Sequence, residues 1–273
     1  MNGPAYSIII PAFDESHRLP RALEEIQEQI TRAGWDAEVI VVSDGSQDDT
    51  CEIVRSYSRS FPALRLVENP GHRGKGYSVR HGMLHANGAI LMFADADLST
   101  PISEGQKLFD AIRAGADLAI GSRWVDTRLQ TKPQPLHRRV LGRVFNLLLR
   151  IVLGLKFKDT QCGFKAFSRP AAHTLFGLQK IEGWGFDAEL LFLARKSGLV
   201  VCEVAVEHRH RGGSKINPLK DGLRMVGDTF EIWLYNRKKQ YPRPLPSAAP
   251  SPAASPAPSS VLVEESEDLG RVA

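Results

Sequence analysis

The sequence has few cysteines, no paired cysteine motif and no long uninterrupted apolar run. Only Cys51, Cys162 and Cys202 occur among 273 residues, and no two of them form a CxxC pair. This spacing argues against a disulfide framework and against a cysteine zinc site, and it favours an intracellular protein. The most apolar stretch, 140–155, contains two arginines and is shorter than the roughly 18 apolar residues of a membrane span.

Acidic residues are unevenly distributed along the chain. The whole sequence carries a formal charge of +4, whereas the segment from Ser247 onward has four acids and one arginine, a charge of −3. The remainder therefore carries +7. Between Thr127 and Lys158 there is no acid but there are eight basic residues. This basic balance predicts an anionic partner, which is a set of phosphate groups, a membrane surface or nucleic acid.

The C-terminal part differs in composition from the rest. Residues 242–260 are almost entirely Pro, Ala and Ser, and an acidic cluster follows them. Such a stretch buries too little apolar surface to offset the entropy lost on ordering. We therefore predict a folded domain over 1–240 and a disordered tail over 241–273.

Strand and helix patterns alternate over the first 121 residues. Short apolar runs predict strands, and segments with helical apolar spacing follow them. The predicted strands are 6–10, 39–42, 64–67, 90–93 and 118–120, and the predicted helices are 19–33, 48–57, 77–86 and 106–114. This alternation predicts an α/β fold with a mainly parallel sheet flanked by helices, which binds its ligands at the carboxyl ends of the strands.

The second half predicts two longer amphipathic helices, 140–155 and 218–235, and a strand at 200–206. On the first of these helices three arginines fall within one stripe, and most of the remaining circumference is apolar. That apolar surface has two interpretations, packing in the core or lying in a membrane interface beside a lipid phosphate.

Polar or glycine-rich segments follow each of the five predicted strands. They are 11–15, 44–50, 69–76, 95–97 and 121–123. Because the carboxyl ends of parallel strands meet at one edge, these segments are expected to converge there. Asp95 and Asp97 suit a divalent cation whose other ligands are phosphate oxygens, although a D-x-D turn with one capping Asp is a common alternative.

Two further residues at these strand ends are candidates for nucleotide binding. The loop 71–76 lacks the GK[ST] of a Walker motif, but its Lys75 is placed to face a phosphate. Asp44 stands directly at a strand end, while Ser46 and Asp48 suit a turn and a helix cap. Asp44 is therefore expected to be free to accept hydrogen bonds from a base or a ribose.

Taken together, these segments resemble the family 2 glycosyltransferases with the GT-A (Rossmann-like) fold, over about Tyr6 to Trp233. The motifs that carry the resemblance are IPAFDE at 10–15, VSDGS at 42–46, RGKG at 73–76, DAD at 95–97 and GSR at 121–123. Similarity to the polyprenyl-phosphate sugar transferases rests on DTQCGFK at 159–165, FDAELL at 186–191 and GGSK at 212–215. The mannosyl branch typically has Lys where this chain has Gly185, so the dolichyl-phosphate β-glucosyltransferases are the more similar group.

The resemblance implies roles for matching residues, with a nucleotide-sugar half over about 1–123 and an acceptor half over 124–240. Residues implied to line the nucleoside pocket are Pro11, Phe13, Glu15 and Asp44. Those implied to hold ribose, diphosphate and a Mg²⁺ or Mn²⁺ ion are Asp95, Ala96 and Asp97, with Ser99 beside them. Those implied to meet phosphates are Arg123, Arg209 and Lys215, and Arg139 is a candidate for the acceptor phosphate.

Sugar transfer from a nucleotide diphosphate develops negative charge on the leaving diphosphate, which a divalent cation and basic side chains stabilise. A hydroxyl acceptor also needs a general base, for which Asp187 is the candidate, with helix capping as its alternative role. A lipid phosphate is already an anion and needs positive charge instead. Cys162 has no nearby His in sequence and is expected to be structural, and His208 and His210 are expected to belong to a basic site.

We therefore predict an inverting hexosyltransferase that moves glucose from UDP-glucose to a polyprenyl phosphate, peripherally bound at the cytoplasmic face of a membrane. GDP-mannose and UDP-N-acetylhexosamine are alternative donors. A nucleotide- or nucleic-acid-binding protein without catalysis is a further alternative, but the sequence lacks a recognition helix and an RNP motif. A third alternative is a purely structural protein at a membrane surface, but such a role would not explain the carboxylates at the strand ends.

Overall fold

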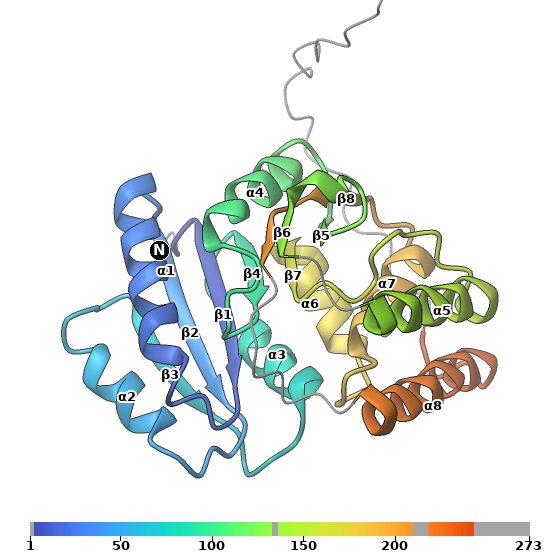
Figure 1. The fold of residues 1–273 in the computed structure, drawn as a ribbon, viewed down its shortest axis with the longest axis horizontal. Coiled ribbons are helices and arrows are strands. Elements are labelled where there is room, and N and C mark those ends of the chain that lie inside the picture. The colour runs from blue at the N-terminus through green and yellow to red at the C-terminus, as the bar shows by residue number, and fades with distance from the viewer. Residues whose placement is uncertain (1–2, 133–135, 210–217, 243–273) are drawn as a thin grey trace, which may run out of the picture.

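The computed structural model describes residues 3–132, 136–209 and 218–242 (Figure 1). A seven-stranded sheet has the order β3-β2-β1-β4-β7-β5-β8. The strands are β1 (Tyr6–Ala12), β2 (Ala37–Ser43), β3 (Leu64–Glu68), β4 (Ile90–Ala94), β5 (Leu118–Ser122), β7 (Phe164–Ser168) and β8 (Val201–Ala205). Only β7 runs antiparallel to its neighbours within this sheet, so the predicted mainly parallel sheet is confirmed. A small parallel pair, β6 (Gln130–Lys132) and β9 (His208–Arg209), lies apart from it.

Helices cover both faces of the sheet, because the strands are apolar on both faces. The helices are α1 (Leu19–Ala33), α2 (Thr50–Tyr57), α3 (Lys75–Leu84), α4 (Gly105–Arg113), α5 (Leu136–Leu153), α6 (Arg169–Leu178), α7 (Phe186–Lys196) and α8 (Pro218–Arg237). Side chains of Ile8 and Ile10 pack with α1, α2 and α4, whereas Ile9 packs with α3, α6 and α7. Alternate residues of β1 therefore belong to two separate cores, as expected of a strand covered on both sides.

The predicted nucleotide-sugar and acceptor halves share this one sheet. Strand β7, from the second half, lies between β4 and β5 of the first half and pairs with both. Neither β7 nor α6 was predicted from the sequence. Tyr241 is buried at 2% exposure, one residue beyond the boundary predicted at 240. The predicted tail from 243 onward lies outside the described residues.

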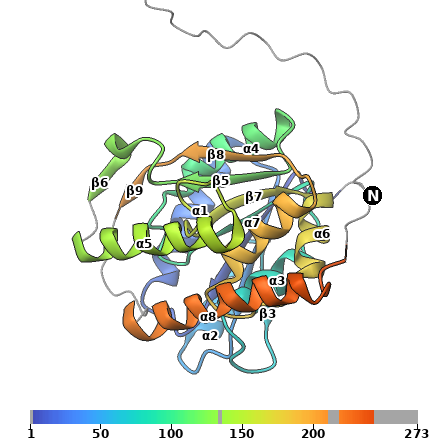
Figure 2. The ribbon, with the colours of Figure 1, turned by 90° about the vertical axis from the view of Figure 1, so that its right-hand side faces the viewer.

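Helices α5 and α8 run side by side outside α7 (Figure 2). On α5, Leu149 and Leu153 are buried, whereas Val144 and Ile151 are 59% and 73% exposed. One face of this helix therefore packs in the core, and contact of its exposed face with a membrane interface stays a prediction. No helix within the described ranges is both long and apolar enough to cross a bilayer.

Candidate active site

The carboxyl ends of β1, β2, β3, β4 and β5 meet at one edge of the sheet, as predicted, because these strands all run in the same direction. β5 has the same direction as β4 because the strand between them, β7, is antiparallel to both. The polar segments that follow the strands form the candidate active site.

Asp44 ends β2, and its carboxylate holds the glycine-rich loop. Oδ1 accepts hydrogen bonds from Asn69 Nδ2 (2.8 Å) and from the backbone amide of Arg73 (2.9 Å). Oδ2 accepts one from the amide of Gly74 (2.8 Å) and lies 2.8 Å from His72 Nδ1. Three established donors and the His72 ring nitrogen thus surround a carboxylate that has roughly four acceptor positions. The carboxylate is therefore not free in this structure, because it holds the loop that presents Lys75. Its contact with a base or a ribose stays a prediction.

Phe13, between β1 and α1, lies beside this loop. The Phe13 ring stands 4.2 Å, centroid to centroid, from the His72 ring. Glu15 forms an ion pair with Arg18 at 2.6 Å, and its backbone amide donates to Thr50 Oγ1. Pro11 is still within β1, opposite Val42 of β2. The predicted nucleoside-binding residues Pro11, Phe13, Glu15 and Asp44 thus gather at the ends of β1 and β2.

Asp95 and Asp97 follow β4, with the buried Ala96 between them. The antiparallel strand β7 begins just after Gly163, which faces Asp95. A Cβ on Gly163 would lie only 2.1 Å from Asp95 Oδ2, so any side chain there would displace the carboxylate. Glycine at position 163 is thus required for the position of Asp95, which explains part of the 159–165 motif.

Lys75 is the first residue of α3, and its Nζ lies 2.5 Å from Asp95 Oδ1. Burial lowers the pKa of Lys75, but the negative charges of Asp95, Asp187 and Asp97 outweigh it and raise the pKa overall. The amine therefore stays protonated. The predicted phosphate-facing lysine and the predicted metal-binding carboxylates occupy one site.

Asp187 lies in the first turn of α7 and forms a buried ion pair with Lys165 of β7. Lys165 Nζ also donates to the carbonyl of Cys162 at 2.6 Å. Burial raises the pKa of Asp187, and Lys165 and Lys75 only partly counter this effect. The cap position of α7 belongs to Gly185, without a side-chain cap, so the alternative capping role of Asp187 is not observed.

Arg123 follows β5 and forms a two-pronged ion pair with Asp159. Nε donates to Oδ2 at 2.6 Å and Nη2 to Oδ1 at 2.8 Å. Burial lowers the pKa of Arg123, but Asp159 outweighs it and raises the pKa. The same pair lowers the pKa of Asp159 against the opposing effect of burial. Asp159, which opens the 159–165 motif but was given no role from the sequence, therefore fixes the guanidinium at this edge.

The backbone links Ser99 to the second half of the chain. The amide of Ser99 donates to Asp97 Oδ1 (2.9 Å), and its carbonyl accepts from the amide of Arg209 (2.8 Å). Arg209 is half exposed and pairs with Glu207. Lys215 lies outside the described residues, as does the side chain of Arg139, whose backbone belongs to α5.

The side chain of Cys162 is only 3% exposed. Burial and the negative charge of Asp159 raise the pKa of its thiol to about 12. Such a thiol is not a nucleophile near neutral pH, which agrees with its predicted structural role. His208 is buried as well, whereas His210 lies outside the described residues.

The residues at this edge fit a divalent cation bound together with a nucleotide diphosphate. No group of three or more His, Cys, Asp or Glu side chains within the described ranges is arranged to hold a metal ion alone. Asp95 and Asp97 offer two carboxylates, and Asp95 already faces one positive charge, that of Lys75. Hard cations such as Mg²⁺ take one or two carboxylates and complete their shell with substrate phosphates and water.

Three comparisons with known proteins agree with this arrangement. Residues 7–176 match the sequence profile of the family described as "Glycosyl transferase family 2". A dolichyl-phosphate beta-glucosyltransferase of Drosophila melanogaster is 39% identical over 241 residues, which is 84% of this chain and 74% of that protein. The Homo sapiens protein of the same description is 30% identical, with the same two coverages.

A solved structure of glucosyl-3-phosphoglycerate synthase from Mycobacterium tuberculosis, with Mn²⁺, UDP-glucose and phosphoglyceric acid, has the same fold. Its TM-score to this chain is 0.61 at 21% identity, covering 86% of this chain and 80% of that one. The α/β fold predicted from the sequence is therefore confirmed.

Proposed function

Because the chain belongs to glycosyl transferase family 2, we propose that it transfers glucose from UDP-glucose to a dolichyl or other polyprenyl phosphate, with inversion at the anomeric carbon. The observation that carries the proposal is the pairing of the Asp95–Asp97 segment with the Lys75 amine at the carboxyl edge of the sheet. The relatives described as dolichyl-phosphate beta-glucosyltransferases support the choice of sugar and acceptor.

The donor side of the reaction needs positive charge where the diphosphate leaves. In the proposed reaction an acceptor phosphate oxygen attacks the anomeric carbon, and the bond from that carbon to the diphosphate oxygen breaks. The electron pair of that bond goes to the departing UDP. Lys75 lies beside Asp95 and supplies a cationic group there, and the backbone of Arg209 contacts Ser99, two residues after Asp97. A divalent cation held by Asp95 and Asp97 would add Lewis-acid stabilisation of the leaving diphosphate.

An anionic acceptor is favoured because Asp187, the candidate base among the described residues, is not free to accept a proton. Asp187, the candidate base, is 3% exposed and bound to Lys165. A carboxylate in a buried ion pair is poorly placed to take a proton from a hydroxyl acceptor. We assign it instead to positioning, because its negative charge keeps Lys75 protonated beside Asp95. A phosphate acceptor needs no such proton transfer.

We assign the exposed apolar side chains of α5 and α8 to binding the lipid part of the acceptor. On α5, Val144 and Ile151 are exposed, and on α8 Leu223 and Phe230 are 67% and 50% exposed. Arg143 lies 5.5 Å from the Trp124 ring, near the end of β5. An amphipathic surface with cations at its edge suits peripheral binding to a membrane with anionic head groups. We propose the cytoplasmic face as its location.

The proposal is tested by incubating the full chain with UDP-[¹⁴C]glucose, Mn²⁺ and a short-chain polyprenyl phosphate in detergent. The expected result is label that partitions into organic solvent and is released as glucose by mild acid. The Asp97→Asn variant, which removes one cation ligand without changing side-chain size, is expected to lose at least 100-fold in rate. Full activity of this variant, or lipid labelling from GDP-[¹⁴C]mannose instead, would overturn the assignment.

A further inference from the structure

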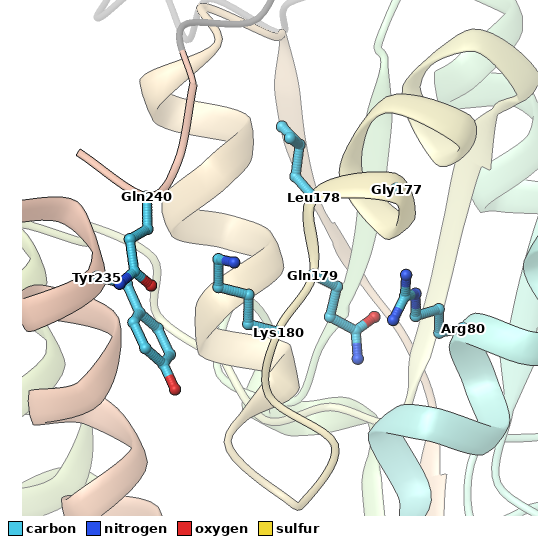
Figure 3. A pocket seen from close by; sticks show the side chains of 7 residues that line it. All are labelled: Arg80, Gly177, Leu178, Gln179, Lys180, Tyr235 and Gln240. Atoms are coloured by element: carbon cyan, nitrogen blue, oxygen red, sulfur yellow. The ribbon is translucent and has the colours of Figure 1, made fainter. Parts of the chain in front are cut away.

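A cavity of about 450 Å³ opens among three helices, separate from the residues of the candidate active site (Figure 3). Arg80 comes from α3, Tyr235 from α8, and the segment 177–180 from the end of α6 and the turn after it. The complete lining is Arg80, Gly177, Leu178, Gln179, Lys180, Tyr235 and Gln240. The size suits a small organic molecule rather than a single ion.

The cavity is cationic. Arg80 and Lys180 both line it, no lining residue is acidic, and neither cation forms an ion pair within the described part of the chain. The buried Nε of Arg80 also finds no acceptor among those residues. The Lys180 ammonium lies 5.7 Å from the centroid of the Tyr235 ring. Two cations that form no ion pair among the described residues, one of them a planar guanidinium, favour an oxyanion as ligand.

The carboxylate of Glu189 lies under this segment but is already bound. It accepts hydrogen bonds from the backbone amides of Lys180 (2.8 Å) and Ile181 (2.9 Å) and from the Tyr241 hydroxyl (2.6 Å). It therefore holds the backbone of the cavity wall, and its negative charge also acts on Lys180. Arg80 forms no ion pair among the described residues.

Gln179 contributes a second, neutral recognition group. This side chain is 4% exposed, and its Nε2 donates to the carbonyls of Gly76 (3.0 Å) and Ile181 (2.7 Å). Two carbonyl acceptors fix the orientation of the amide, because a flipped amide would place its oxygen against both. The buried Oε1 is then left without a donor from the described residues. Figure 3 shows the Gln179 amide and the Arg80 guanidinium pointing toward one another.

We propose that this cavity binds a small organic oxyanion that also carries a hydroxyl group, as in a phosphate monoester of a polyol. Arg80 and Lys180 bind the oxyanion, and the hydroxyl donates the hydrogen bond that Gln179 Oε1 lacks. A buried acceptor without a donor is unfavourable, so the hydroxyl adds affinity that a bare anion does not gain. The same amide donates to the carbonyl of Gly76, which follows Lys75, so Gln179 links the cavity to the start of α3.

The test is calorimetric titration of the full chain with glycerol 3-phosphate and, separately, with inorganic phosphate. We expect saturable binding of glycerol 3-phosphate that is tighter than binding of inorganic phosphate. The affinity is expected to stay the same when UDP and Mn²⁺ are present in excess. Lys180→Gln and Arg80→Gln are each expected to weaken binding at least 10-fold. The control Lys238→Gln changes an exposed lysine beyond α8 and is expected to bind like the unmodified chain.

Lys180 is exposed, so its substitution leaves the fold intact even if Arg80→Gln lowers the melting temperature. Absence of saturable binding, or unchanged affinity in Lys180→Gln, would overturn the proposal. Displacement of glycerol 3-phosphate by UDP and Mn²⁺ would place the ligand in the candidate active site and overturn it as well. If UDP does not bind at all, the proposed function fails, while the two cavity variants still decide this inference.

Discussion

The backbone amide of Gly185 donates a 3.0 Å hydrogen bond to Oδ2 of Asp228, and this contact joins α8 to the start of α7. A Cβ on Gly185 would stand 2.4 Å from the Cβ of Asp228, so α8 approaches this closely only over a glycine. α8 carries the exposed Phe230, and α7 carries Asp187. The surface that we assign to the membrane is thereby fixed directly to the active-site segment. A lysine at position 185, as in the mannosyl branch, does not fit this arrangement.

The Gly185→Ala substitution is expected to displace α8 and to lower stability by about 1–3 kcal/mol through overpacking. We expect glucose transfer to polyprenyl phosphate to fall at least 10-fold, while UDP affinity changes less than 2-fold, because the nucleotide-binding residues lie on other elements. Rates with lipid acceptor and UDP titrations measure the two effects. Gly183→Ala is the matched control, since its Cβ would meet Asp228 Oδ2 at an ordinary 3.7 Å. Equal activity in the two variants would contradict the coupling.

Gly163→Ala is expected to abolish activity by moving the Asp95 carboxylate. The new Cβ would overlap Asp95 Oδ2, which lies 2.1 Å away, and the aspartate has to leave its position beside Lys75. We expect at least a 100-fold loss of transfer and weaker Mn²⁺-dependent UDP binding, with a cooperative melting transition retained. Gly142→Ala on α5, where no atom lies within 4 Å of the new Cβ, serves as the stability control. A Gly163→Ala enzyme with normal UDP binding would be incompatible with the proposed role of Asp95.

The exposed face of α5 is expected to bind lipid. A Val144→Glu/Ile151→Glu double variant places charge on two side chains that are 59% and 73% exposed, so the fold tolerates both. We expect flotation with anionic liposomes to drop several-fold, and transfer to liposomal polyprenyl phosphate to drop with it, while UDP affinity is unchanged. Val200→Glu, at 57% exposure before β8, is the control for an added surface charge. Identical flotation of all three proteins would rule out this face as the membrane contact.

The Arg123–Asp159 pair is expected to make stability depend on acidic pH. Burial acts to raise the pKa of Asp159, but Arg123 outweighs it, so the folded pKa lies below the unfolded value near 3.9. The stabilisation is therefore complete above about pH 4 and is lost as the pH falls through the folded pKa. Asp159→Asn leaves Arg123 unpaired and is expected to cost about 3 kcal/mol at pH 7.

Urea unfolding between pH 3 and 7 measures this effect. The difference in unfolding free energy between the unmodified chain and Asp159→Asn is expected to shrink steadily below pH 4. Asp49→Asn, a change at an exposed residue, controls for the general loss of negative charge. A difference that stays constant down to pH 3 would show that the pair does not set the acid sensitivity.

Patterns along the chain predicted the first five parallel strands and their common polar edge, because each of those strands is a compact apolar run. β7 was missed because its second residue is Lys165, and a lysine in a short apolar run indicates a solvent-facing position. In the fold this lysine is fully buried and pairs with Asp187, a partner 22 residues away. Only tertiary structure makes a lysine compatible with the middle of this sheet.

In the candidate site, too, the sequence predicted which residues are present, whereas their contacts depend on tertiary structure. The sequence located Asp44, Asp95 and Lys75, but not which of them contact one another. Asp44 uses its carboxylate on the amides of a loop 29 and 30 residues later, a pairing that no local pattern predicts. The role of Gly163 depends equally on the antiparallel placement of β7 beside β4.

The central claim, glucose transfer from UDP-glucose to a lipid phosphate, is tested most directly by nucleotide release from a panel of sugar nucleotides. The full chain is incubated with each donor and Mg²⁺ or Mn²⁺, with and without a short-chain polyprenyl phosphate. We predict UDP release from UDP-glucose alone, and only when the lipid phosphate is present. Equal release without lipid, or release from GDP-mannose in preference to UDP-glucose, would contradict the account.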